Sequence, residues 1–149
     1  MGAIYPIEIV QTPRQVVVLA EFLTQTRRIY LNEKMPALED ISPGYNGYSV
    51  GRWEGETLVV QTIGVREDVK FLEIPHSAQM KVTERLRLTG PDLLENQVTI
   101  DDPKFLARPY TFTFGYRRNP EYRIMEYICD NNRNRFDADG NVSLEVAPK

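Results

Sequence analysis

Glu84 is a carboxylate placed among hydrophobic residues. In the run "QMKVTERLRLT" over 79–89, strand alternation puts it on one face with Met80, Val82, Leu86 and Leu88. A carboxyl group desolvated in apolar surroundings has a raised pKa, which a general acid or base working near neutral pH needs. Glu84 is therefore a candidate catalytic residue.

Glu126 repeats this pattern in "EYRIMEYIC" over 121–129. Alternation gives it Tyr122, Ile124 and Ile128 as neighbours on one face. Two inward carboxylates demand partners, because burying an uncompensated charge costs several kcal/mol. The same pair could instead be a structural ion-pair network that fixes strand register, so both interpretations stay open.

Two arginines are candidates for the compensating charge. Arg52 is expected to face inward with Tyr48 and Val50, and Arg28 shares a face with Tyr30. Either guanidinium would also stabilise an oxyanion formed in a reaction. For Arg52 the prediction depends on one parity, because in the opposite register Trp53 fills the core and Arg52 becomes a surface charge.

His76 is the sole histidine, at the end of the longest irregular segment, 65–78. Loops at the mouth of a barrel often carry function, although a lone histidine is more often a surface or turn residue. With Glu84 or Glu126 it would form an acid–base pair that operates near neutral pH.

Further polar and aromatic side chains are expected to surround a ligand. Asn96 is the polar member of an apolar face in 93–101, and buried tyrosine hydroxyls seek partners that a ligand can supply. The predicted substrate-binding residues are Arg28, Tyr30, Tyr48, Asn96, Tyr110, Phe112, Phe114 and Tyr116. Ordinary core aromatics are the structural alternative for the rings.

The elements that must position these residues are β-strands separated by turns. Strands are expected over 4–10, 15–23, 26–31, 47–54, 57–64, 79–89, 93–101, 108–118 and 121–129. Short links such as Gly55-Glu56 favour antiparallel neighbours. The prediction is a single all-β domain over 1–149: a small antiparallel, up-and-down, lipocalin-like barrel of about eight or nine strands with a helical turn in 65–78. A β-sandwich is the alternative.

Composition excludes several classes of function. A net charge of −3 and a pI near 5.3 argue against nucleic-acid binding. One cysteine, Cys129, allows no intrachain disulfide, and one histidine argues against a histidine-based zinc site. No nucleotide-binding glycine motif is present, so no cofactor or metal is expected.

No run is long enough to span a membrane. The chain is expected to be cytoplasmic as given, or periplasmic if it is a processed form, and a homodimer stays open.

Several blocks resemble a large group of uncharacterised bacterial proteins, many of which look exported. These blocks are "NGYSVGRWEGETLVV", "PHSAQMKVTERL" and "VTIDDPKFLARPYTFT", and the similarity runs from about residue 5 to 132. The resemblance implies a bacterial origin and adds no activity. The segment after "TIG" reads "VRED", where Phe-Asn-Asp is common in the group, which implies a different substrate if that loop covers the site.

The leading hypothesis is a cofactor-independent enzyme that moves protons on a small, largely apolar or aromatic molecule held inside the barrel, as an isomerase, lyase or cyclase does. Glu84 or Glu126 would be the base and His76 the acid or shuttle. The alternative is a lipocalin-like binding protein that uses the same pocket without catalysis. A third hypothesis is a structural β domain whose interior is filled.

Overall fold

The computed structural model describes residues 5–70, 75–127, 134–136 and 142–144. Eight strands form one sheet: β1 (Ile7–Gln11), β2 (Gln15–Ala20), β3 (Gln25–Leu31), β4 (Tyr48–Glu54), β5 (Thr57–Ile63), β6 (Lys81–Gly90), β7 (Leu93–Asp101) and β8 (Tyr110–Arg117). Two short strands, β9 (Asn134–Phe136) and β10 (Val142–Leu144), pair only with each other among the described residues.

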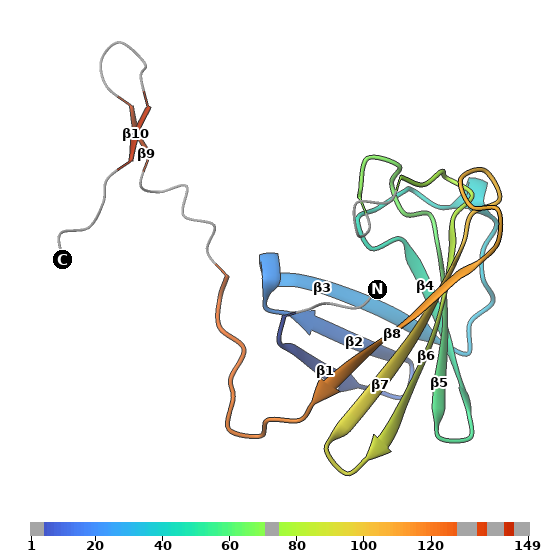
Figure 1. The fold of residues 1–149 in the computed structure, drawn as a ribbon, viewed down its shortest axis with the longest axis horizontal. Coiled ribbons are helices and arrows are strands. Elements are labelled where there is room, and N and C mark those ends of the chain that lie inside the picture. Colours follow the sequence, from blue (N-terminus) through green and yellow to red (C-terminus); the bar gives the residue numbers. More distant parts are fainter. Residues whose placement is uncertain (1–4, 71–74, 128–133, 137–141, 145–149) are drawn as a thin grey trace.

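The sheet follows the order of the chain, from β1 to β8, and curls into a half-barrel. Figure 1 shows β1–β3 lying crosswise to β5–β7, which is how the curl brings the first strands over the later ones. All neighbours are antiparallel except β3 and β4. Within the described part of the chain, β1 and β8 are the two open edges of the sheet.

The predicted fold class, an all-β protein with a small barrel-like sheet, is confirmed. The expectation that every neighbour is antiparallel is wrong at β3 and β4, which are parallel. Residues 32–47 separate these strands, and a connection of that length can return the chain to the end from which β3 began. The short links elsewhere leave no room for such a return.

Helical structure in the described residues is limited to two single 3-10 turns, η1 (Phe22–Thr24) and η2 (Leu38–Asp40). No helix in the described part of the chain is long and apolar enough to cross a bilayer. The helical turn predicted in 65–78 is absent from its described residues, 65–70 and 75–78.

Two apolar clusters line the inner face of the curled sheet. One cluster contains Val65, Met80, Val82, Val98 and Ile100, with Phe112 and Phe114 packed against it. The other contains Val16, Ile29, Leu31, Leu58 and Val60, with Val18 and Leu86 against it. In β2, β3, β5, β6, β7 and β8 the residues of these clusters lie at alternate positions, as period-two patterning requires.

The pairing of β4 with β5 shows which residues of β4 face inward. Gly55 has a positive φ of 61° and begins a two-residue turn, as the sequence predicts. Trp53 pairs with Leu58 and Gly51 with Val60, so these residues share the inner face. Arg52 therefore points outward, and its predicted inward orientation is wrong. Val50 misled the prediction because it is buried on the outer face.

Candidate functional site

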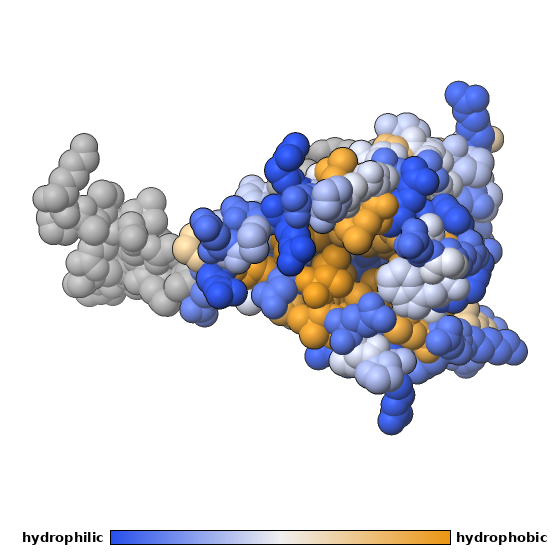
Figure 2. Space-filling view, turned by 90° about the horizontal axis from the view of Figure 1, so that it is seen from below, coloured by the Kyte–Doolittle hydropathy of each residue, from blue (hydrophilic) through white to orange (hydrophobic). Residues whose placement is uncertain are grey.

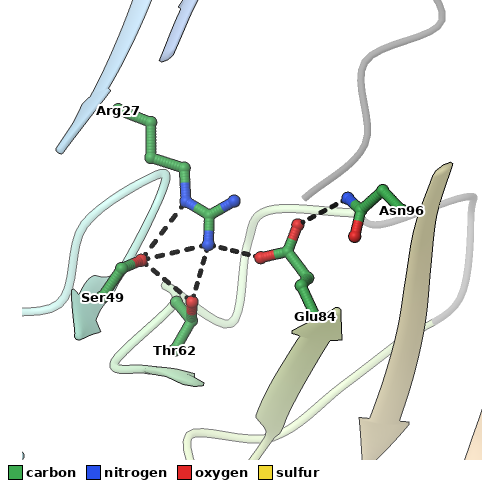
Figure 3. A network of polar contacts seen from close by, with 5 residues as sticks. All are labelled: Arg27, Ser49, Thr62, Glu84 and Asn96. Carbon is green, nitrogen blue, oxygen red and sulfur yellow. Dashed lines mark hydrogen bonds and ion pairs between the residues drawn. The ribbon is translucent and has the colours of Figure 1, made fainter. Parts of the chain in front are cut away.

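Five side chains from five strands meet in the middle of the inner face, and we call them the inner polar cluster (Figure 3). Its members are Arg27 from β3, Ser49 from β4, Thr62 from β5, Glu84 from β6 and Asn96 from β7, five strands in sequence. All are buried. The cluster borders both apolar clusters, because four of its members lie two residues from a member of an apolar cluster on the same strand: Arg27 from Ile29, Thr62 from Val60, Glu84 from Val82 and Asn96 from Val98.

The Arg27 guanidinium is the centre of this arrangement. Its Nε donates to Ser49 Oγ over 3.2 Å, and its Nη2 donates to Thr62 Oγ1 over 2.8 Å and to Glu84 Oε2 over 2.5 Å. The Ser49 and Thr62 hydroxyl oxygens are 2.9 Å apart. A planar guanidinium suits this role because its donors lie in a fixed fork.

Glu84 is ionised by this environment. Burial by itself would raise the pKa of its carboxyl group, but the adjacent Arg27 guanidinium outweighs burial and holds that pKa well below its ordinary value. The raised pKa expected of a catalytic Glu84 is therefore wrong, because alternation located the carboxylate but not the guanidinium beside it. Glu84 is a buried, charge-compensated group.

Asn96 completes the cluster and carries an unusual atom. Its Nδ2 donates to Glu84 Oε1 over 3.0 Å. Its Oδ1 is buried and has no hydrogen-bond partner, and it is the one such side-chain atom found among the described residues. Buried polar atoms are nearly always satisfied, so an exception requires an explanation.

An apolar groove with a volume of about 380 Å³ lies on one side of the cluster. Its walls include Val16, Val18, Ile29, Trp53, Leu58, Leu86 and Leu94. Figure 2, the view from below, shows apolar residues gathered in a hollow between hydrophilic rims. Trp53 at 46% exposure and Leu88 at 69% leave apolar surface open at this groove.

A wider cleft of about 810 Å³ lies at the other end of β5 and β6. It is lined by the loop residues 35–39, the end of β5, residues 78–83, Asp101 and Pro103. Thr62 belongs both to this lining and to the inner polar cluster. Apart from Thr62, the cleft contains no cluster member, and its mixed polar and charged lining defines no ligand class.

His76 and Ser77 anchor the start of β6 through backbone contacts. His76 is buried, with Nε2 2.7 Å from the Val69 carbonyl oxygen and Nδ1 3.2 Å from that of Ser77. Asp102 accepts hydrogen bonds from the Ser77 amide and hydroxyl over 2.6 and 2.9 Å. Asp102 thus binds Ser77 rather than the imidazole, so these three residues are not arranged as a catalytic triad.

Asp102→Asn is expected to lower the free energy of unfolding by about 1–3 kcal/mol, because one carboxylate oxygen becomes a donor facing donors. Burial would raise the pKa of Asp102, but hydrogen bonds from Ser77 and backbone amides lower it. The contribution of Asp102 to folding stability is therefore fully present above its pKa in the unfolded chain, about 3.9. It is lost as pH falls through its pKa in the folded protein. Urea denaturation at several acidic pH values measures both effects.

Asp101→Asn is the matched control, because Asp101 is the neighbouring, exposed residue. We expect it to change stability by less than about 0.5 kcal/mol. An Asp102→Asn variant with unchanged stability at neutral pH and an unchanged acid limb would contradict the anchoring role.

Four predicted site residues lie on the outer face. Arg52 donates to Glu54 Oε1 over 2.8 Å and is exposed, and Arg28 is also exposed. The Tyr30 and Tyr48 rings stack on each other with centroids 5.1 Å apart, and the Tyr48 hydroxyl donates to Glu33 over 3.3 Å. None of the four reaches the inner polar cluster, because each sits one residue away from an inward position.

The last predicted strand explains why the carboxylate of Glu126 was misplaced. Residues 121–127 are not in a strand, and Glu126 is exposed, so its predicted inward orientation is wrong. An alternating pattern needs a neighbouring strand to become a ladder, and β8 is the last strand of the sheet. Cys129 and the rest of that predicted strand, 128–129, lie outside the described residues.

The aromatic face of β8 is placed as the alternation predicts. Phe112, Phe114 and Tyr116 are half-buried on the inner side, whereas Tyr110 is 49% exposed near the start of the strand. Phe112 and Phe114 meet edge to face, with centroids 5.3 Å apart. Among the described residues, none of the predicted site residues lines the groove or the wider cleft.

The predictions missed Arg27, Ser49 and Thr62. Arg27 and Thr62 could have been found by extending the apolar alternation of their own strands. Arg27 shares a face with Ile29 and Leu31, the two residues that are buried in β3 with it. Thr62 follows Leu58 and Val60 in the same way. Polar residues at the end of an apolar stripe are therefore the pattern to search for.

Comparisons with known proteins add no family. No family model matches the chain, and neither the curated proteins nor the solved structures compared with it give a match. The resemblance to a bacterial group stays a prediction. Function has to be argued from the groove and the inner polar cluster.

Proposed function

We propose that this protein binds a small, largely apolar molecule in the groove of its inner face. The observation that carries the proposal is the groove itself: about 380 Å³, walled by inward aliphatic side chains and Trp53, and adjoining the inner polar cluster. Ligand sites are typically apolar hollows of about 300–1,000 Å³ with a few convergent polar groups. The groove supplies the apolar hollow, and Gln11, Glu56 and Arg87 are the polar side chains in its lining.

Binding without catalysis has the better physical support. Glu84 is paired with Arg27 over 2.5 Å, and its lowered pKa makes it a poor proton acceptor near neutral pH. The two His76 ring nitrogens face the carbonyl oxygens of Val69 and Ser77. Proton-transfer catalysis by Glu84 and His76 stays a prediction that would require these contacts to open.

Phenylnaphthylamine, an uncharged apolar fluorophore, provides a direct test. Trp53 is the sole tryptophan and lines the groove, so it should transfer excitation energy to the bound probe. Saturable, one-site binding with quenching of Trp53 emission is the expected result. A Trp53→Phe variant should keep the affinity, measured by probe emission, and lose the energy transfer.

A pair of neighbouring variants locates the site. Leu86→Gln puts an amide in the groove wall and should weaken probe binding roughly tenfold, from the apolar contact that is lost. Arg85→Gln changes the adjacent, exposed residue, and should leave affinity unaltered. Equal affinities for both variants, or no saturable binding to the unaltered protein, would refute the proposal.

A further inference from the structure

The strand β8 forms an open edge of the sheet. It pairs with β7 on one side, and among the described residues no strand pairs with its other side. Its register with β7 runs through consecutive residue pairs from Tyr110 to Arg117 without a bulge. A straight edge of this kind presents a row of backbone N–H and C=O groups that can pair with a further strand.

β8 lacks the features by which soluble proteins usually protect an edge. Charged side chains, prolines and bulges block the addition of a strand. The residues from Tyr110 to Tyr116 are uncharged and include no proline. At the opposite edge, β1 is only five residues long, follows Pro6 and carries the exposed Glu8. Of the two edges, β8 is therefore the one suited to strand addition.

Burial of the inner face also falls sharply between β7 and β8. Val98 is 0% exposed, whereas its partner in β8, Phe112, is only half-buried. Ile100 is buried as well, and its partner Tyr110 is 49% exposed. A strand added beside β8 would extend the inner face past these rings, so the edge offers apolar contact in addition to backbone hydrogen bonds.

The sequence of β8 is nearly the same in both directions. It reads Tyr-Thr-Phe-Thr-Phe-Gly-Tyr over 110–116, and only the exchange of threonine for glycine at 115 breaks the symmetry about Thr113. Two antiparallel copies centred on Thr113 would therefore set similar residues opposite each other. The pairs would be Thr113 with its own copy, Phe112 with Phe114, Thr111 with Gly115, and Tyr110 with Tyr116.

This register also satisfies the geometry of an antiparallel ladder. Residues opposite each other must lie on the same face of the sheet, which requires that the twofold axis pass through a residue pair. With the axis at Thr113, the aromatic rings of both copies share the inner face and no charges oppose each other. An axis at Phe112 or Phe114 would set a tyrosine against Arg108 or Arg118, beyond the ends of the strand.

We propose that β8 pairs with β8 of a second copy of this chain, antiparallel and with the twofold axis at Thr113. The contact is isologous, so it closes at two chains and covers both β8 edges. It joins two eight-stranded sheets into one continuous sheet. Contact of β8 with β1 of another copy would instead be head-to-tail and would leave an edge open for further growth.

Sedimentation velocity of the full chain at increasing concentration tests the association. We expect the 17.2 kDa chain to convert into a particle of twice that mass and to grow no further. A single chain at every concentration up to about 100 µM would overturn the proposal. A series of still larger particles would overturn it too, because that result indicates a head-to-tail contact.

A pair of charge variants locates the axis. Thr113→Glu and Thr113→Lys each change an exposed side chain and set like charges opposite each other, so each should weaken self-association about tenfold. A mixture of the two variants should recover the association, because glutamate then faces lysine. Recovery in the mixture is specific to an axis at this residue.

Gln97→Glu is the matched control. Gln97 is the exposed partner of Thr113 in β7, one strand in from the edge, so this variant should associate like the unaltered protein. Undiminished association of Thr113→Glu, or no recovery in the mixture, would refute the β8 contact centred on Thr113. Sedimentation of the unaltered protein remains decisive for the association even if a variant fails to fold.

Discussion

Arg27→Met is expected to lower the free energy of unfolding by about 3–5 kcal/mol, because it removes the guanidinium from a fully buried carboxylate. Glu84 is 1% exposed, so the energy of its hydration is not recovered from solvent. Ser49 and Thr62 lose their donor as well. Chemical denaturation followed by far-ultraviolet circular dichroism measures the change.

Arg28→Met is the matched control, because Arg28 is the next residue and points outward to solvent. Its effect should stay within about 0.5 kcal/mol. The double variant Arg27→Met/Glu84→Met should recover much of the lost stability, since replacing a whole buried ion pair by apolar residues is often neutral. A loss below about 1 kcal/mol for Arg27→Met would show that the pair does not hold the interior together.

The pH dependence of stability should also weaken at Glu84. In the unaltered protein the folded pKa of Glu84 lies below the ordinary value, so its contribution to stability is present above about pH 4.3 and is lost as pH falls through the folded pKa. Arg27→Met removes the largest lowering influence, so the folded pKa of Glu84 rises and the stability lost between the unfolded and the folded pKa becomes smaller.

Gly47→Ala is the second large expected effect, with a loss of about 2–4 kcal/mol. Gly47 has a positive φ of 61°, and a Cβ atom there would lie 2.4 Å from the backbone oxygen of Ile63. Neither the left-handed backbone nor that contact can be relieved by moving a side chain. β4 begins at the next residue, so the strain acts on the start of the strand that carries Ser49.

Gly55→Ala separates the two causes. Gly55 has the same φ of 61°, but a Cβ atom there meets nothing within 4 Å. Its loss should be about 1 kcal/mol, the cost of the left-handed conformation alone. The difference between the two variants in thermal or urea denaturation then gives the cost of the close approach. Equal losses would mean that the contact with Ile63 is readily relieved.

Much of the fold was predictable because its turns are local. The β4–β5 and β6–β7 hairpins and the inward orientation of Glu84 and Asn96 follow from runs in which one face is plainly apolar. The parallel junction of β3 and β4 was not predictable in this way. It depends on where a long connection returns the chain, and no short-range pattern encodes that.

The candidate site was harder to predict because a shift of one residue along a strand moves a side chain to the opposite face of the sheet. Choosing Tyr30 as inward moved the counter-charge from Arg27 to Arg28, one residue along. In β4 both faces are buried in part, since Ser49 and Val50 are both inaccessible, so alternation could not choose between them. The inward orientation predicted for Glu126 was wrong for another reason: its alternating segment does not pair with a neighbouring strand.

The parallel junction also divides the sheet into two antiparallel meanders, β1–β3 and β4–β8. They are joined by the register pairs of Ile29, Tyr30 and Leu31 with Ser49, Val50 and Gly51, the shortest ladder within the sheet. Arg27 comes from the first meander, and the other four members of the inner polar cluster come from the second. This seam is where the sheet can open while breaking the fewest backbone hydrogen bonds. Because Arg27 bonds to Ser49, Thr62 and Glu84 across this seam, opening the seam would also break these contacts, so the buried ion pair acts as a clasp across a hinge.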